Sequence, residues 1–399
     1  MTTYEVAEDF AQDPHLLAEL LRAEGPVRRA KMPRGLPCYL VTGFAEARLL
    51  LADPRLSKDS GRARALFEAK LPSGEPAQGG VGQDLSFHML NSDPPDHTRL
   101  RKLVNKAFTA RTVARLRPRV EEITAELLDG LAGRERADLL ASFAAPLPIT
   151  VICELLGVRA ADRTEFSEWS KTLLSSSTPE AMQAAAQNMF AYLTDLIAQK
   201  RTEPAEDLLS DLVHASDDGD SLSEAELVSM AFLLLVAGHE TTVNLIANGV
   251  LALLREPEQL ALLRSDPSLL PNAVEEFLRF DGPIHLATLR FTAEPVEVGG
   301  VTIPEGEFVL VSLLGANRDE ERYPEPDRLD ITRAAGGHLA FGHGIHYCVG
   351  APLARLEAEI ALGGLLARFP GLALDAKPDE LVYRPSSLVH GLEALPVRL

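Results

Sequence analysis

The segment of this 399-residue chain with the most distinctive residue pattern is Phe341-Gly-His-Gly-Ile-His-Tyr-Cys-Val-Gly350. A helix is expected directly after it, from Ala351-Pro352 to Phe369. Unpaired N–H groups and the positive end of the helix dipole favour a thiolate at a helix start. Cys348 is therefore a candidate metal ligand, although a lone cysteine is more often a small buried apolar side chain.

This stretch, together with His338 just before it, also permits a zinc site. His338, His343 and His346 lie within eleven residues of one another and of Cys348, and imidazole and thiolate are zinc ligands. Zinc loops usually pair ligands two to four residues apart and do not require the phenylalanine and glycines found here. A zinc hydrolase is thus one alternative, and a centre in which Cys348 binds another metal is the other.

Composition narrows the class of protein. Hydrophobic residues make up 46% and charged residues 24%, which is typical of a packed globular chain. The net charge of −19 argues against nucleic-acid binding, which needs cations to displace phosphate counterions. The three cysteines are odd in number and far apart, which fits a reducing cytoplasm better than a disulfide framework.

No membrane attachment is expected. The N-terminal residues Met1 to Phe10 lack a basic region followed by an apolar core, so they do not resemble a secretion signal. The longest apolar stretch, Met230 to Gly238, is about half of what a membrane span requires.

The remaining patterns predict a mainly α-helical chain with small β-sheets. We expect a strand over 37–43, a helix over 45–52 and an irregular loop over 71–82. Ser223 and Glu226 form a capping box that opens a helix running to Arg255, with Leu233 to Ala237 buried all round. Strands are expected at 296–298 and 301–303 around a double-glycine turn, at 307–311, at 387–392 and at 394–397.

Phe341-x-x-Gly344-x-His346-x-Cys348-x-Gly350 resembles the haem-binding signature of the cytochrome P450 family. The resemblance covers essentially the whole chain. It implies the cytochrome P450 fold in a single domain over residues 1–399, with haem b bound through the Cys348 thiolate. Glu276-Phe-Leu-Arg279 resembles the Glu-x-x-Arg motif of the family, with Arg328 as the third member of a bracing network.

The long central helix contains Ala237-Gly-His-Glu-Thr-Thr242, where glycine and threonine weaken a helix. A packing notch is one explanation. The resemblance implies another: Gly238 and Thr241 open a groove above the iron, Thr241 hydrogen-bonds oxygen and water, and Glu240 relays protons from solvent. Glu240 and Thr241 are thus the expected catalytic residues.

Haem propionates require cations or hydrogen-bond donors. The resemblance assigns this role to His97, Arg101, Arg290 and His346, and assigns other cofactor contacts to Gly238, Phe341, Gly342 and Gly350. By position in the family fold, substrate contacts are expected from the residues Phe87, Met89, Leu173, Leu174, Leu233, Val236, Ala237, Ile284, Leu286, Leu388 and Val389. Nearly all are apolar, which implies an apolar or amphipathic small molecule.

The resemblance implies a monooxygenase that inserts one atom of O2 into its substrate, by hydroxylation or epoxidation. Similar actinobacterial enzymes oxidise macrolides, polyketides or terpenoids in secondary metabolism and antibiotic biosynthesis. Because no reductase domain is appended, electrons are expected from a ferredoxin and its reductase, and the protein is expected to be a cytoplasmic monomer. A non-catalytic haem protein that binds or senses a gas is an alternative.

Eight basic residues and no acidic residue lie between Thr98 and Val120. This segment is either a solvated helix face, a site for anionic groups of a cofactor, or a docking patch for an acidic ferredoxin. Arg355 is expected to belong to the same docking patch.

Overall fold

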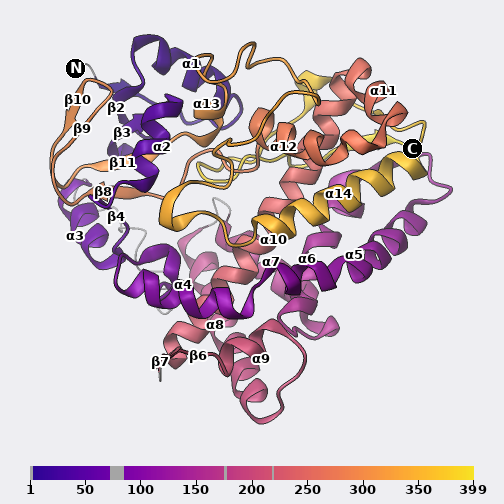
Figure 1. Cartoon of the computed structure of the whole chain (residues 1–399), viewed down its shortest axis with the longest axis horizontal. Helices are drawn as coiled ribbons and strands as arrows, with labels where there is room; N and C mark the ends of the chain where they lie inside the picture. The colour runs from indigo at the N-terminus through magenta and orange to yellow at the C-terminus, as the bar shows by residue number, and fades with distance from the viewer. Residues whose placement is uncertain (1–2, 72–84, 175–177, 218–219) are drawn as a thin grey trace. The chain divides into compact units, whose positions relative to one another are not determined.

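A computed structural model describes residues 3–71, 85–174, 178–217 and 220–399 (Figure 1). The chain divides into two compact units, and each is described by itself. The first unit contains Met1–Leu56, Val120–Leu147 and Thr241–Leu399, and the second contains Ser57–Arg119 and Pro148–Glu240. The expected single domain over 1–399 stays a prediction.

The first unit is built around a six-stranded mixed sheet with the strand order β1-β2-β3-β11-β8-β4. These strands are β1 (Tyr4–Glu5), β2 (Val27–Lys31), β3 (Pro37–Val41), β4 (Leu56–Ser57), β8 (Arg290–Thr292) and β11 (Phe308–Val311). The apolar run Cys38 to Val41 is fully buried, because β3 pairs with β2 on one side and with β11 on the other. The strands predicted at 37–43 and 307–311 are confirmed.

Smaller sheets complete the strands of this unit. The predicted hairpin is confirmed as β9 (Val296–Val298) and β10 (Val301–Ile303), which are antiparallel. Its turn has φ of 55° at Gly299 and 72° at Gly300, a conformation that glycine adopts without steric cost. A three-stranded sheet joins β12 (Ala373–Leu374), β13 (Pro396–Arg398) and β5 (Arg136–Asp138).

The other elements of the first unit are helices. They are α1 (Pro14–Glu24), α2 (Phe44–Ala52), α11 (Pro257–Ser265), α12 (Leu270–Asp281), α13 (Leu313–Asn317) and α14 (Ala351–Arg368), with short turns η1 (Pro33–Gly35), η4 (Leu140–Ala144), η6 (Pro267–Leu269), η7 (Gly344–His346) and η8 (Pro378–Glu380). The helix expected after Gly350 is confirmed by α14. The helix predicted over 45–52 is α2, and Asp53 is its C-cap.

The second unit is almost entirely helical. Its elements are α3 (Ser60–Lys70), η3 (Met89–Asn91), α4 (Asp96–Ala107), η5 (Ala160–Asp162), α7 (Arg163–Leu174), α8 (Pro179–Thr202), α9 (Leu208–Val213), β6 (Ser216–Asp217) and β7 (Asp220–Ser221). Three helices continue from one unit into the other along the sequence: α5 (Ala110–Leu131), α6 (Pro146–Leu155) and α10 (Glu224–Arg255).

The 32-residue helix α10 confirms the predicted long helix and its capping box. The Ser223 N–H donates to Glu226 Oε2 at 2.8 Å, and the Glu226 N–H donates to Ser223 Oγ at 3.3 Å. By length and composition α10 could cross a membrane, but 78% of its most apolar window is buried within the protein. Ala237 is exposed, so the expectation of burial up to Ala237 is wrong.

The strand predicted over 387–392 is also wrong. This segment makes isolated bridges, with Val389 opposite Ile284 and Leu392 opposite Tyr383. Ser386 Oγ accepts the N–H groups of Leu388 and Val389, which bends the backbone out of a continuous ladder. The second predicted C-terminal strand is present as β13, shifted to Pro396–Arg398. Apart from Leu71, the loop expected over 71–82 lies outside the described residues.

Candidate active site

The cysteine loop of the first unit is folded by two glycines with left-handed backbone. Gly342 has φ of 71° and Gly344 has φ of 75°, values that L side chains rarely adopt. The Gly342 N–H donates to the Leu339 carbonyl at 2.8 Å, and the Cys348 N–H donates to the Phe341 carbonyl at 2.9 Å. The loop therefore closes on itself and brings Cys348 beside Phe341, three residues before α14 begins.

Gly344 and Gly350 also leave room for close neighbours. A Cβ at Gly344 would lie 2.8 Å from the Leu51 carbonyl oxygen and 2.9 Å from Ala52 Cα, so the loop lies directly against the end of α2. A Cβ at Gly350 would lie 3.8 Å from Cys348 Sγ. This is an ordinary van der Waals distance, so Gly350 lies directly beside the thiol.

Cys348 differs from the other two thiols of the chain. Cys38 and Cys153 are buried, and burial raises the pKa of each thiol to about 12. Cys348 is exposed and precedes a helix N-terminus, where the dipole favours a thiolate. An open thiol in a glycine-lined loop could serve as a ligand of haem iron.

A charged network braces the loop. The Arg355 guanidinium lies 4.5 Å from the centre of the Phe341 ring, and its Nε and Nη2 donate to Glu275 at 2.5 and 2.9 Å. His338 Nε2 lies 3.2 Å from the same carboxylate. Burial would raise the pKa of Glu275, but the bonds from Arg355 and His338 lower it to about 2. Sequence reasoning missed Glu275, which adjoins the recognised Glu276 and carries no motif of its own.

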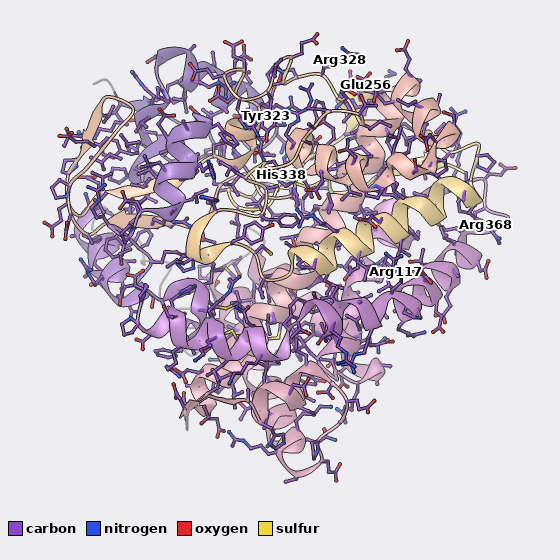
Figure 2. The ribbon with its side chains drawn as sticks, in the orientation of Figure 1. Arg117, Glu256, Tyr323, Arg328, His338 and Arg368 are labelled. Carbon is purple, nitrogen blue, oxygen red and sulfur yellow. The ribbon has the colours of Figure 1, made fainter. Side chains whose placement is uncertain are left out.

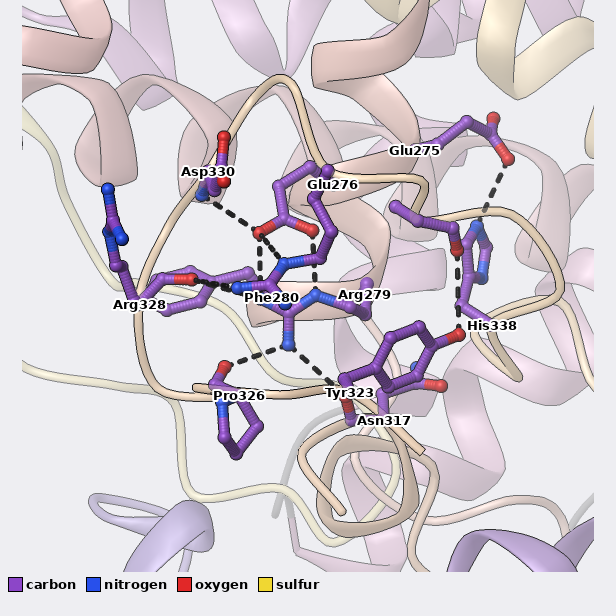
Figure 3. Close-up of polar contacts among 12 residues, drawn as sticks. Glu275, Glu276, Arg279, Phe280, Asn317, Tyr323, Pro326, Arg328, Asp330 and His338 are labelled. Carbon is purple, nitrogen blue, oxygen red and sulfur yellow. Dashed lines mark hydrogen bonds and ion pairs between the residues drawn. The ribbon is translucent and has the colours of Figure 1, made fainter. Parts of the chain in front are cut away.

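Glu276 and Arg279 form a fully buried ion pair on α12, with Nε donating to Oε2 at 2.7 Å (Figure 3). The Arg279 guanidinium also donates to three backbone carbonyls, those of Asn317, Pro326 and Arg328. These bonds anchor the irregular segment that leads towards the cysteine loop. Buried charges are stable only when paired in this way.

Arg333 provides the third side chain of this network, and the prediction that Arg328 would provide it is wrong. Arg333 Nε donates to Glu276 Oε1 at 3.3 Å, and its side chain is 13% exposed. The Arg328 side chain is 61% exposed and pairs with Glu325, so this residue contributes only its carbonyl oxygen (Figure 2). The turn at Asp330, closed by the Thr332 N–H, reverses the chain so that Arg333 reaches Glu276.

The first unit holds further predicted site residues. Arg290 lies on β8, is buried and donates to the Thr288 carbonyl at 2.9 Å, and His346 is half-buried at the end of η7. Two segments with predicted substrate contacts are brought together, because the His285 N–H donates to the Leu388 carbonyl at 2.9 Å. The residues concerned are Ile284, Leu286, Leu388 and Val389.

In the second unit, His97 and Arg101 lie one turn apart on α4, with His97 buried and Arg101 half-buried. Two cations of the basic segment are paired there with carboxylates: Arg99 with Glu226, and Arg119 with Glu154. The expected docking patch therefore carries less unpaired charge than its sequence suggests. Arg111, Arg115 and Arg117 are exposed.

The middle of α10 has two features that bear on the predicted catalytic residues. A Cβ at Gly238 would lie 3.0 Å from Ile152 Cδ1, so the glycine allows close packing of α6 on α10. Glu240 is buried, with its Oε1 3.4 Å from Nε2 of the buried His239, which sequence reasoning did not single out. His239 Nδ1 lies 2.8 Å from the Leu235 carbonyl, and Thr241 is half-buried.

The other predicted substrate contacts of the second unit differ in exposure. Met89, Leu233 and Val236 are buried, Leu173 is half-buried, and Phe87 is 55% exposed. The side chain of Leu174 lies outside the described residues.

The loop histidines do not form a metal cluster. Within the described residues, the group of three side chains whose ligand atoms lie within 4.8 Å of one another is His15, Asp281 and His390. His338 is bonded to Glu275 instead. This arrangement argues against the zinc site considered for Cys348 and its neighbouring histidines.

Comparison with known proteins identifies the family of the chain. The sequence model of the cytochrome P450 family matches residues 149–390. The chain therefore belongs to this family. It is 57% identical to cytochrome P450 107B1 of Saccharopolyspora erythraea, over 100% of this chain and 99% of that protein. It is 53% identical to cytochrome P450 monooxygenase PikC of Streptomyces venezuelae, over 98% and 92% of the two chains.

A solved structure of the P450 monooxygenase TamI with bound tirandamycin C superposes with a TM-score of 0.93 at 52% identity, covering 99% of this chain and 100% of TamI. The expected cytochrome P450 fold is thereby confirmed. The chain is a haem-thiolate monooxygenase that uses O2 and external electrons. The family assignment decides against both a zinc hydrolase and a non-catalytic gas sensor.

Proposed function

We propose that Cys348 is the thiolate ligand of the haem iron. The observation that carries this proposal is the contrast among the three thiols: Cys348 is exposed before α14, whereas Cys38 and Cys153 are buried with raised pKa values. When bound, haem would supply iron for O2 activation, and Cys348 as its thiolate ligand would favour O–O cleavage. The glycine loop orients the sulfur, and the Arg355–Glu275 pair keeps Phe341 in place beside it.

The test is the ferrous carbonyl spectrum of Cys348→Ser, compared with Cys38→Ala and Cys153→Ala. We expect the far-red-shifted Soret band of thiolate ligation in the wild type and in both control variants, and its loss in Cys348→Ser. A thiolate spectrum that persists in haem-loaded Cys348→Ser would refute the assignment.

We propose that His97, Arg101, Arg290 and His346 hold the haem propionates, and that Gly238, Phe341, Gly342 and Gly350 contact the rest of the cofactor. Arg290 supports this proposal because it presents a buried guanidinium on β8, and a guanidinium donates the charge-assisted hydrogen bonds that a propionate carboxylate accepts. Replacing Arg290 by Gln should weaken haem retention at least tenfold, measured by haem transfer to apomyoglobin. Arg134→Gln, at an exposed arginine, is the matched control.

We propose that Thr241 and Glu240 handle protons during turnover. A carboxylate and a hydroxyl that are adjacent on α10, one buried and one half-buried, can pass protons while the site stays otherwise dry. His239 would position the Glu240 carboxylate through the contact at 3.4 Å. In Thr241→Ala we expect more electrons to be lost to hydrogen peroxide and a lower yield of product per NADPH. Unchanged coupling would contradict this role.

We propose that the substrate is an apolar or amphipathic secondary metabolite, such as a macrolide, polyketide or terpenoid. The apolar side chains that meet at Ile284 and Val389 support burial as the main source of affinity. TamI, with tirandamycin C bound, shares more than half of this sequence. A panel of macrolactones, screened by the spectral shift of the haem and then by turnover, tests the proposal. A panel of polar sugars should give no shift.

We propose that a ferredoxin and its reductase supply the electrons to a cytoplasmic, monomeric, single-domain protein. The exposed Arg115 and Arg117, on a segment without acidic residues, suit an acidic ferredoxin. Charge reversal at both positions should slow reduction by ferredoxin at low salt at least tenfold, measured by stopped-flow. Reversal at Arg134 should leave the rate unchanged. Equal rates in the Arg115 and Arg117 variant would contradict the docking patch.

A further inference from the structure

Three side chains that can bind a metal converge in the first unit, outside the cysteine loop. His15 Nε2 lies 2.9 Å from Asp281 Oδ1, and His390 Nε2 lies 3.0 Å from the same oxygen. All three ligand atoms lie within 4.8 Å of one another. They come from α1, from the last residue of α12 and from the C-terminal segment, so the convergence is a product of the fold.

Two of the three distances between ligand atoms are close to those of a zinc site, and the third, between the two Nε2 atoms, lies within 4.8 Å. Zinc–nitrogen bonds of about 2.0–2.1 Å and zinc–oxygen bonds of about 2.0–2.2 Å place tetrahedral ligands about 3.3–3.5 Å apart. The two nitrogen–oxygen distances need to open by only a few tenths of an ångström. The two imidazole rings are 6.0 Å apart and nearly perpendicular, at 81°, with both Nε2 atoms directed at Asp281.

The backbone behind two of these ligands is fixed from α10. Asn248 Nδ2 donates to the carbonyl of Asp281 at 3.1 Å and to the carbonyl of His390 at 3.2 Å. The His390 N–H donates to the Pro283 carbonyl at 2.9 Å, and the Tyr383 ring stacks on the imidazole at 4.6 Å and 12°. These contacts fix the backbone of Asp281 and the ring of His390, whereas His15 Nδ1 is buried without a hydrogen-bond partner among the described residues.

Charge and access also permit a cation. Asp281 contributes a carboxylate, and the neighbouring Arg318 guanidinium, which interacts electrostatically with Asp281 and His15, donates hydrogen bonds to the Phe280 carbonyl and to Asp327. The side chains of His15 and Asp281 are 20% and 13% exposed, whereas that of His390 is 3% exposed. The side of the cluster formed by His15 and Asp281 is therefore the more open to solvent.

We propose that His15, Asp281 and His390 form a site for a divalent metal of the zinc class, distinct from the haem iron. Two imidazoles and one carboxylate with an open fourth position are a ligand set that zinc accepts. The bound ion joins α1 and the C-terminal segment to α12, residues that are far apart in the sequence. Binding to the folded chain alone raises its thermal stability by mass action.

The experiment uses the haem-loaded protein after treatment with a chelator and dialysis. Zinc is titrated against a chromogenic chelator, and bound zinc and iron are counted by mass spectrometry. We expect one zinc per chain, a rise in Tm of about 3 °C at saturating zinc, and two imidazole ligands in the zinc-edge X-ray absorption spectrum. The haem spectrum reports the folded state separately.

His15→Gln and Asp281→Asn should each weaken zinc binding at least tenfold, and His214→Gln, at an exposed histidine outside the cluster, should not. His15→Gln is the more conservative change, because His15 is the most exposed of the three ligands. If the wild type takes up less than a tenth of an equivalent at micromolar free zinc, or if both variants bind like the His214→Gln control, the three residues form only a hydrogen-bonded cluster and the proposal is wrong.

Discussion

Gly344 has both a left-handed backbone and a close contact with the end of α2, and replacing it by Ala disturbs both. The left-handed backbone, with φ of 75°, costs an alanine about 1–2 kcal/mol. The new Cβ would also lie 2.8 Å from the Leu51 carbonyl oxygen and 2.9 Å from Ala52 Cα. An ordinary contact requires about 3.4 Å or more, so backbone on one side has to move, which adds about 1–3 kcal/mol.

Gly342→Ala is the matched control. Gly342 has φ of 71°, but a Cβ there meets only the His346 carbonyl oxygen, at 3.9 Å. This variant should lose about 1–2 kcal/mol through backbone conformation alone. The expected difference between the two variants is therefore the cost of the close approach to α2.

Both variants are measured by urea unfolding of the haem-loaded protein and by the ferrous carbonyl spectrum. We expect Gly344→Ala to lose about 2–5 kcal/mol of unfolding free energy and to show a reduced far-red-shifted Soret band, because the loop that presents Cys348 is displaced. If the two variants lose the same free energy, or if Gly344→Ala is neutral, the contact with α2 does not position the loop.

Two further predictions concern buried charge. Arg333→Gln should lower the free energy of unfolding by about 1–3 kcal/mol, because Glu276 loses a charged donor in a fully buried site. Arg328→Gln should change it by no more than about 0.5 kcal/mol, because the Arg328 side chain is exposed. Equal urea midpoints for the two variants would mean that the Arg328 side chain belongs to the network after all. Burial raises the pKa of Glu357 well above its ordinary value of 4.5, and within the described residues its Oε2 has no hydrogen-bond partner. When burial raises the pKa of an acid in the folded state, the free energy of unfolding is highest below the unfolded pKa and falls as the pH rises. Glutamine does not titrate, so the free energy of unfolding of Glu357→Gln should rise relative to that of the wild type by up to about 1.4 kcal/mol for each pH unit above pH 4.5. A difference that is constant between pH 5 and pH 8 would contradict the shift.

Sequence patterns predicted the elements whose signals are local. The capping box at Ser223 and Glu226, the double glycine at 299–300 and the helix start after Gly350 all depend on residues a few positions apart, and the structure has each of them. The failed strand over 387–392 had the right alternation. Its ladder is interrupted by Ser386, which a pattern of apolar residues cannot reveal.

Long-range partners were beyond the sequence. Arg333 takes the place expected of Arg328 because the turn at Asp330 brings the Arg333 side chain to Glu276, and no motif in the sequence marks that turn. Glu275 was overlooked because its partner, Arg355, lies 80 residues away. His15, Asp281 and His390 lie in three separate parts of the sequence, and only the fold brings them within ligand distance.

The position of Cys348 depends on supports that belong to no single motif. Gly344 seats the loop against the end of α2, and Arg355 covers Phe341, whose carbonyl accepts the Cys348 N–H. Arg355 is held in turn by Glu275 on α12, one residue before the glutamate that binds Arg279. The adjacent carboxylates of Glu275 and Glu276 thus have different partners. Glu275 holds Arg355 against the cysteine loop, and Glu276 holds Arg279, which anchors the segment before that loop. Because α12 connects both, a change that tilts this helix should disturb thiolate ligation even though no residue of α12 contributes the ligand.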